Sequence, residues 1–185
     1  MKVTVIDAGY VGLTTALALA YIGHDVAVVE KDREKLEILR EGRSPLYEKG
    51  LDELLKIVRE DVFFTENLDD CVPSADIVMI AVGTPAKKNG EADLSYVEQA
   101  VKGIAESLRP GGSYTIVIKS TVPVGTNEMV SQKLSQLLNQ RNVSCDVHIV
   151  SNPEFLREGM ALQDTFYPER IVVGTRSRKA ISDLQ

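Results

Sequence analysis

The fold is decided by residues 2–30, which read KVTVIDAGYVGLTTALALAYIGHDVAVVE. Residues 3–6 are rich in β-branched side chains and predict a short strand, and residues 8–12 form a tight turn that opens a helix. Gly23 ends this helix as a C-terminal glycine does. The apolar run 26–29 shows no alternation, which is typical of a strand buried on both faces. The stretch therefore predicts a βαβ unit.

The turn in this unit is of the kind that binds a dinucleotide. A pyrophosphate binds the free N–H groups at a helix N-terminus, and glycines let the backbone approach it closely. Gly9 and Gly12 match the second and third glycines of G-x-G-x-x-G, but Asp7 stands at the first position. Glu30 ends the second strand, where a carboxylate can hold the ribose hydroxyls of an adenosine. The order of elements favours a dinucleotide site; the alternative is a plain βαβ unit without a ligand.

The composition indicates a single α/β domain. The chain has 185 residues and a formal net charge of −6, which argues against nucleic acid or an anionic membrane surface as its partner. The apolar run from Ala8 to Gly23 is shorter than the roughly 20 residues of a membrane helix. The first strand leaves no room for a signal peptide, so we expect a cytoplasmic protein. Cys71 and Cys145 lack metal or disulfide spacing and fit a reducing compartment.

Strands and helices alternate along the rest of the chain. Further strands are predicted at residues 62–65, 77–82, 114–118, 147–150 and 171–173, and helices at 31–41, 51–58, 94–108 and 127–141. Asn67 is expected to cap a short acidic helix. This alternation predicts an α/β fold of the Rossmann-like, doubly wound type, with a mainly parallel sheet and helices on both faces.

Three polar clusters follow strands of this sheet, namely Gly83-Thr84-Pro85, Ser120-Thr121 and Asn152 to Glu158. Ligands bind such sheets beyond the carboxyl ends of the strands, so we expect the clusters to converge on one crevice. Oxidation of an alcohol needs a group that accepts the hydroxyl proton, and Glu154 beside a threonine hydroxyl suits that task. Alternatively, Thr121 caps a turn, and Glu154 or Glu158 caps or pairs with the next helix.

Four stretches together resemble the nucleotide-sugar 6-dehydrogenases, the UDP-glucose/GDP-mannose dehydrogenase family. They are residues 9–12 (GYVG), residues 44–51 (SPLYEKGL), residues 119–126 (KSTVPVGT) and residues 152–159 (NPEFLREG). The third is most similar to the UDP-glucose branch. The resemblance implies oxidation of the C6 alcohol of UDP-glucose to a carboxylate, with two hydride transfers to two NAD⁺ and a cysteine-bound intermediate that water hydrolyses.

The resemblance also implies roles for individual residues. For the cofactor NAD, Gly9, Tyr10, Val11 and Gly12 hold the pyrophosphate, Glu30 the adenine ribose with Lys35 alongside, and Thr84 the nicotinamide half. Thr121 is expected to bind a catalytic water or the reacting oxygen, and Glu154 to act as the general base. The backbone of Phe155, Leu156, Arg157 and Glu158 is expected to form a rail for the UDP-sugar, with Glu158 close to the nicotinamide.

The family's nucleophilic cysteine lies in a later segment, and neither cysteine of this chain matches it. We therefore expect residues 1–185 to be the N-terminal NAD-binding domain, inactive alone, with the central helix and the C-terminal substrate domain absent. The full-length protein is expected to be a homodimer, through contacts mostly in that central helix. Two alternatives stay open: a dehydrogenase of another nucleotide sugar or a small hydroxy acid, and a non-catalytic Rossmann module that serves assembly.

Two positions bear on the cofactor directly. Asp7 replaces a family glycine, and a carboxylate about 5 Å from a phosphate charge repels it by roughly 3 kcal/mol at an effective dielectric near 20. That is about a hundredfold in affinity, so weak NAD⁺ binding is predicted. Aspartate tolerates unusual backbone angles, so the fold should persist. The Glu30 carboxylate repels a 2′-phosphate, which favours NAD over NADP.

Overall fold

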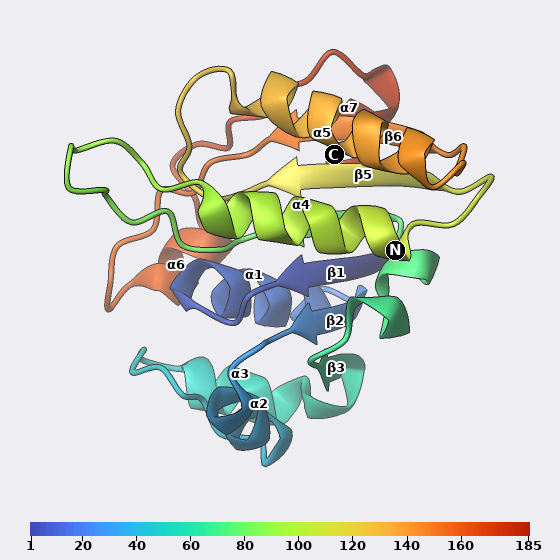
Figure 1. Ribbon diagram of the computed structural model, residues 1–185. Helices are drawn as coiled ribbons and strands as arrows, with labels where there is room; N and C mark the ends of the chain where they lie inside the picture. The colour runs from blue at the N-terminus through green and yellow to red at the C-terminus, as the bar shows by residue number, and fades with distance from the viewer.

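A computed structural model describes residues 1–185 (Figure 1). One sheet holds six strands in the order β3-β2-β1-β4-β5-β6, and every neighbouring pair is parallel. The strands are β1 (Lys2–Ile6), β2 (Asp25–Val29), β3 (Val62–Thr65), β4 (Ile77–Ile80), β5 (Ser113–Ile118) and β6 (Asp146–Ser151). The strand order reverses between β1 and β4, and ligands bind at such a switch point.

Helices cover both faces of this sheet. They are α1 (Tyr10–Tyr21), α2 (Arg33–Arg40), α3 (Leu51–Ile57), α4 (Ser95–Ser107), α5 (Thr126–Gln140), α6 (Ala161–Phe166) and α7 (Arg178–Asp183). Three short 3₁₀ helices lie between α3 and β4: η1 (Arg59–Asp61), η2 (Leu68–Asp70) and η3 (Val72–Ser74). The doubly wound, Rossmann-like α/β fold predicted from the sequence is confirmed.

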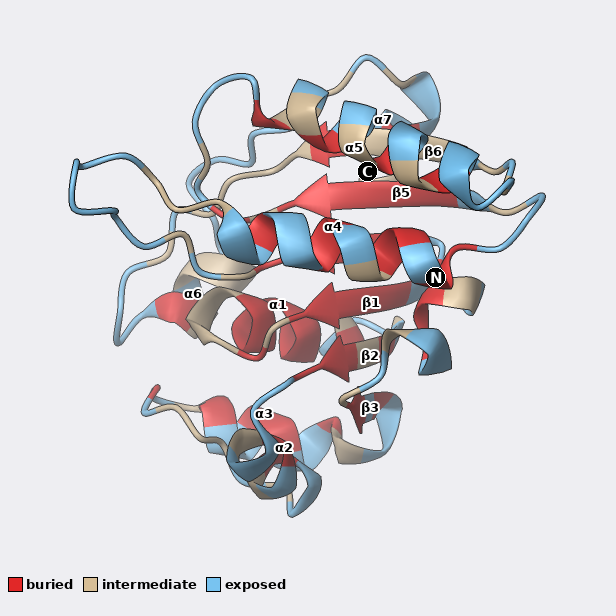
Figure 2. Cartoon of the chain, viewed as in Figure 1, coloured by how far each residue is buried: buried red, intermediate tan, exposed pale blue.

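The core forms two apolar clusters, one on each face. Leu13 and Leu17 of α1 pack on one face with leucines of α2 and α3, and Ile104 of α4 and Leu134 of α5 pack on the other. The outer sides of α4 and α5 are exposed, whereas α1 is buried along most of its length (Figure 2). Because α3 and α6 pack against α1, this helix has no solvent stripe. Its apolar run therefore marks the centre of the domain.

Two predicted elements are wrong. Residues 171–173 form no strand, because this segment meets the edge strand only through one antiparallel bridge between Ser151 and Gly174. Its apolar side chains stay exposed, with Ile171 at 71%. The Asn67 side chain makes no capping hydrogen bond. The backbone N–H of Asn67 donates to Thr65 Oγ1 at 3.0 Å. The acidic segment that follows makes two 3₁₀ turns rather than a helix.

None of the helices has the length and hydrophobicity needed to cross a bilayer.

Candidate functional site

The turn between β1 and α1 is closely packed. A Cβ on Gly12 would lie 1.9 Å from the carbonyl oxygen of Asp7, so only glycine fits there. Asp7 itself has a φ of 84°, in the left-handed region where a glycine is usual. Its Oδ2 accepts the Gly9 N–H at 2.9 Å. The fold thus accommodates the aspartate, and its side chain bonds the turn that it belongs to.

Glu30 lies buried at the carboxyl end of β2. Its Oε2 accepts the Ala8 N–H at 3.1 Å and its Oε1 accepts the Asp32 N–H at 2.8 Å. It lines a cavity of about 500 Å³ together with Asp7 and Lys35. Each oxygen keeps a second lone pair for a hydroxyl donor. The cavity therefore suits a ribose, and Glu30 is held in place before any ligand arrives.

The ends of β4 and β5 are tied together near the switch point. Thr84 Oγ1 donates to the Thr121 carbonyl at 2.7 Å, and Ser120 Oγ donates to the Val82 carbonyl at 2.6 Å. The Thr121 side chain is exposed and its hydroxyl has no bonded partner. These bonds bring the first two polar clusters together, and they leave the Thr121 hydroxyl available to a ligand.

The third cluster, residues 152–159, is a loop whose amides are held by carboxylates. Glu154 Oε2 accepts the Leu156 N–H at 2.7 Å, Asp164 Oδ2 accepts the Arg157 N–H at 3.0 Å, and Glu48 Oε2 accepts the Gly159 N–H at 2.9 Å. The carbonyls of Phe155, Leu156 and Glu158 accept no hydrogen bond. We call residues 155–158 the rail. Carboxylates bind its amides at Leu156 and Arg157, and its carbonyls are free acceptors except that of Arg157, which accepts the Met160 N–H at 3.0 Å.

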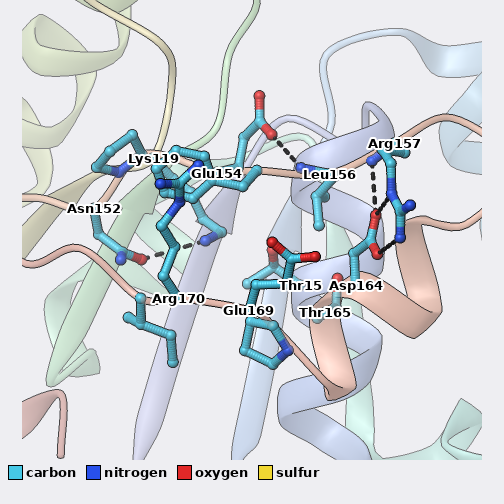
Figure 3. Close-up of a pocket in the computed structure, with 14 residues that line it drawn as sticks. Thr15, Lys119, Asn152, Glu154, Leu156, Arg157, Asp164, Thr165, Glu169 and Arg170 are labelled. Atoms are coloured by element: carbon cyan, nitrogen blue, oxygen red, sulfur yellow. Dashed lines mark hydrogen bonds and ion pairs between the residues drawn. The ribbon is translucent and has the colours of Figure 1, made fainter.

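Beside the rail is a cavity of about 420 Å³ (Figure 3). Lys119, at the end of β5, reaches Asn152 Oδ1 with its Nζ at 3.3 Å, and Glu154 lies nearby. Burial lowers the pKa of the Lys119 ammonium, against the attraction of the Glu154 carboxylate. The cavity is therefore lined by a partly desolvated amine and by the predicted general base.

The predicted site residues divide into two groups. Those expected at the adenosine end, Glu30 and Lys35, share one cavity. Glu154 lines the cavity beside the rail, whereas Glu158 is exposed and lines neither. The Phe155 ring carries the Arg170 guanidinium at 4.6 Å from its centroid. The crevice is thus two cavities at one edge of the sheet, with the Thr84–Thr121 contact belonging to neither lining.

Three residues of the site have no role predicted from the sequence. Lys119 and Glu48 lie within two of the four stretches that carry the resemblance, and Asp164 lies outside all four. Asp164 binds the Arg157 guanidinium as well as its amide. Glu48 is the buried residue of the loop 41–50. Tyr10 Oη donates to the neighbouring Tyr47 carbonyl at 2.6 Å. Glu48 and Gly159 are 111 residues apart in the sequence, so only the structure reveals that the Glu48 carboxylate binds this amide.

The two cysteines lie away from the crevice. Cys71 is buried beside η3 and Cys145 is partly buried before β6. Burial raises the pKa of both thiols. Neither side chain lines either cavity, so neither is placed to act as a nucleophile there.

The fold and the glycine turn define a doubly wound dinucleotide-binding domain. Residues 1–185 match the NAD binding domain of the UDP-glucose/GDP-mannose dehydrogenase family. The chain is a member of that family, and its cofactor is accordingly NAD.

Relatives with known sequences and structures agree with this assignment. The UDP-glucose 6-dehydrogenase of Rhizobium meliloti is 43% identical over 192 residues, which cover 100% of this chain and 43% of that protein. The structure of a UDP-glucose dehydrogenase from Pyrobaculum islandicum has a TM-score of 0.90 at 38% identity, covering 98% of this chain and 42% of that one. A GDP-mannose dehydrogenase from Pseudomonas aeruginosa has a TM-score of 0.92 at 33% identity, covering 100% and 43%.

These proteins carry different sugar nucleotides in their names, so the family fixes a nucleotide-sugar dehydrogenase and not its substrate. This chain spans well under half the length of each.

The residues present fit the cofactor at one end and not at the other. Glu30, buried and already oriented by two amides, suits the adenine ribose. At the pyrophosphate turn, however, the Gly9 amide, one of the donors at the helix N-terminus that can bind a phosphate, is occupied by the Asp7 carboxylate. The structure thus orients Glu30 at the adenosine half, whereas at the phosphate half the chain itself already bonds one backbone donor.

Proposed function

We propose that this chain is the cofactor-binding domain of a UDP-glucose 6-dehydrogenase. In the complete enzyme, the C6 alcohol of UDP-glucose is oxidised to the carboxylate of UDP-glucuronate in two hydride transfers to two NAD⁺. Water supplies the second carboxylate oxygen, and protons are released. The observation that carries the proposal is the position of the segments 119–126 and 152–159 at the carboxyl ends of adjacent parallel strands.

In this proposal each of three side chains has one task. Glu154, whose Oε2 accepts one amide at 2.7 Å, keeps its other oxygen to take a proton from water. The exposed Thr121 hydroxyl holds that water or the reacting oxygen. Glu158 is assigned to the nicotinamide half. The cofactor, when bound, accepts the hydride from the substrate.

In this proposal the rail binds the sugar of the substrate. Its free carbonyls at Phe155, Leu156 and Glu158 are acceptors, and they match the hydroxyl donors of a hexose. Its guanidinium at Arg157 is already paired with Asp164 and is less available to a phosphate. The nucleophilic cysteine, the central helix, the C-terminal substrate domain and the dimer contacts belong to the remainder of the polypeptide in this proposal.

Chemical-shift mapping of the amides of this chain tests the substrate. With NAD⁺ present, UDP-glucose should perturb residues 154–159 more strongly than GDP-mannose or UDP-N-acetylmannosamine does. Equal perturbation by all three would leave only the family, and a preference for another sugar would replace UDP-glucose with that substrate.

A second candidate, a non-catalytic Rossmann module that serves assembly, is favoured by one observation, the occupied Gly9 amide. The two candidates differ in the effect of NAD⁺ on thermal stability. A ligand at about 100 times its dissociation constant adds about 2.7 kcal/mol of stability. The absence of any shift up to millimolar NAD⁺, at every pH at which the domain is folded, would support the assembly module.

A further inference from the structure

The pyrophosphate end of the cofactor site holds a charge of its own. Oδ2 of Asp7 lies 2.9 Å from the nitrogen of Gly9, whose N–H it accepts. At a helix N-terminus that binds phosphate, that amide points at the ligand. The next three amides, of Tyr10, Val11 and Gly12, have no partner in the structure. One of the four donors is therefore already used by the protein.

The carboxylate belongs to the turn and is not a flexible arm that happens to lie there. The backbone of Asp7 has a φ of 84°, and its amide donates to the Val29 carbonyl at 2.8 Å. A Cβ on Gly9 would lie 2.6 Å from Asp7 Oδ2. The side chain thus lies against the same turn atoms that a phosphate would approach.

Other charged groups surround it. The cavity that Asp7 lines also contains these titratable side chains: Glu30, Lys31, Asp32, Lys35 and Tyr96. Burial raises the pKa of the Asp7 carboxyl, and the Glu30 carboxylate raises it further, against the lowering effects of the Gly9 amide and Lys35. A phosphate would add more negative charge beside the same carboxyl.

We infer that the Asp7 carboxylate is an internal substitute for a cofactor phosphate, so that a dinucleotide binds tightly only when Asp7 takes up a proton. The inference rests on the proposed NAD-binding function. Protonation removes the charge on Asp7, weakens its bond to the Gly9 amide and provides an O–H donor for a phosphate oxygen. A bound anion favours this protonated form, so the complex holds more protons than the free domain.

The sign of the pH dependence follows from this linkage. The pKa of Asp7 is higher in the complex than in the free domain. NAD⁺ affinity therefore rises as the pH falls from the pKa in the complex toward the pKa in the free domain. For one proton, the rise is at most tenfold per pH unit.

Calorimetric titration of the chain with NAD⁺ tests the inference, from about pH 7.5 to about pH 5.5, in buffers with different ionisation enthalpies. We expect an increasing affinity and a net uptake of up to one proton per NAD⁺. Asp7→Asn should bind more tightly than the wild type at neutral pH and should lose the pH slope. Adenosine, which contains the ribose and no phosphate, should bind wild type without a slope.

Asp32→Asn is the matched control, because it removes a carboxylate from the same cavity and keeps a side chain that can cap α2. It should keep the wild-type slope. A slope that persists in Asp7→Asn, or wild-type binding without proton uptake while Asp7→Asn binds, overturns the inference and leaves NAD binding intact. If neither protein binds at any pH, the inference fails together with the proposed cofactor function. Proton uptake by the wild type needs no variant and decides the matter even if Asp7→Asn does not fold.

Discussion

The two ends of the crevice contain the same bond with opposite consequences. At the turn, a carboxylate accepts the amide of Gly9, which is the donor that a phosphate would use. In the rail and at Gly159 directly after it, carboxylates accept the amides of Leu156, Arg157 and Gly159, and the carbonyls of Phe155, Leu156 and Glu158 stay free. A carboxylate on a backbone amide thus occupies a donor at the turn, whereas beside the rail it leaves neighbouring carbonyl acceptors unbonded.

The largest effect is expected at the turn. Asp7→Gly removes the carboxylate and restores a residue that adopts a positive φ without strain. We expect NAD⁺ to bind about a hundredfold more tightly near neutral pH, since roughly 3 kcal/mol of repulsion is lost. Calorimetry with NADP⁺ as a second ligand measures this, and NADP⁺ should stay weak because Glu30 remains. Unchanged affinity for NAD⁺ would show that the carboxylate does not obstruct the phosphate.

The next effect concerns the rail. Glu48→Ala leaves the Gly159 amide without its acceptor in a partly buried position, so we expect a loss of about 1–3 kcal/mol in the free energy of unfolding. Urea denaturation measures the loss, and hydrogen exchange should accelerate at Gly159. Glu48→Gln keeps an acceptor and should recover most of the stability.

Asp52→Ala is the control for that variant. Asp52, in the first turn of α3, accepts the amide of Ser44 in the loop that contains Glu48 at 2.7 Å, and it makes no hydrogen bond to the rail. Its removal should leave the exchange rate at Gly159 unchanged. If both variants accelerate exchange at Gly159 equally, the loop is acting through general stability and Glu48 does not hold the rail.

Most of the architecture could be predicted from the sequence, because it depends on local patterns. β3 was predicted at its observed bounds, and the helix after Gly9 follows from one apolar run. The strand predicted at residues 171–173 is absent for a reason that the local pattern does not contain. An apolar run beside an edge strand becomes a strand only when a ladder of hydrogen bonds forms, and here a single bridge forms. The predicted cap at Asn67 is absent: its side chain makes no capping bond, and its backbone N–H donates to the Thr65 hydroxyl oxygen.

The candidate site was less predictable than the fold. Glu30 and Gly12 follow from spacing within one βαβ unit, and the structure puts them where spacing indicates. The carboxylates that bind the amides of this loop could not be predicted in this way. Glu48 lies more than a hundred residues from Gly159, and no periodicity links the two. The roles of Thr121, Glu154 and Glu158 stay predictions, which depend on family resemblance and on ligands that bind at the same edge of the sheet.

A smaller, pH-dependent effect distinguishes the second carboxylate of the rail. The Arg157 guanidinium and amide lower the pKa of the Asp164 carboxyl below its ordinary value of 3.8. The stabilisation is therefore complete above that value and is lost as the pH falls through the lower, folded-state pKa. Asp164→Asn should unfold at a lower temperature than the wild type near neutral pH, and the difference should vanish in strong acid. Asp69→Asn, which breaks an exposed pair with Arg109 at 3.6 Å, should change little at either pH.

The smallest effect is expected at the thiols, which belong to neither end of the crevice. Since burial raises the pKa of Cys71 and Cys145, little thiolate exists near neutral pH, and alkylation of both should be slower than that of a free thiol. Cys71 is only 6% exposed and should react after Cys145. Mass spectrometry follows the two rates, and calorimetry on protein alkylated at Cys145 should give an unchanged NAD⁺ affinity. If a thiol instead reacted rapidly and NAD⁺ protected it, that thiol would lie in the crevice. A cysteine would then act there together with the carboxylates.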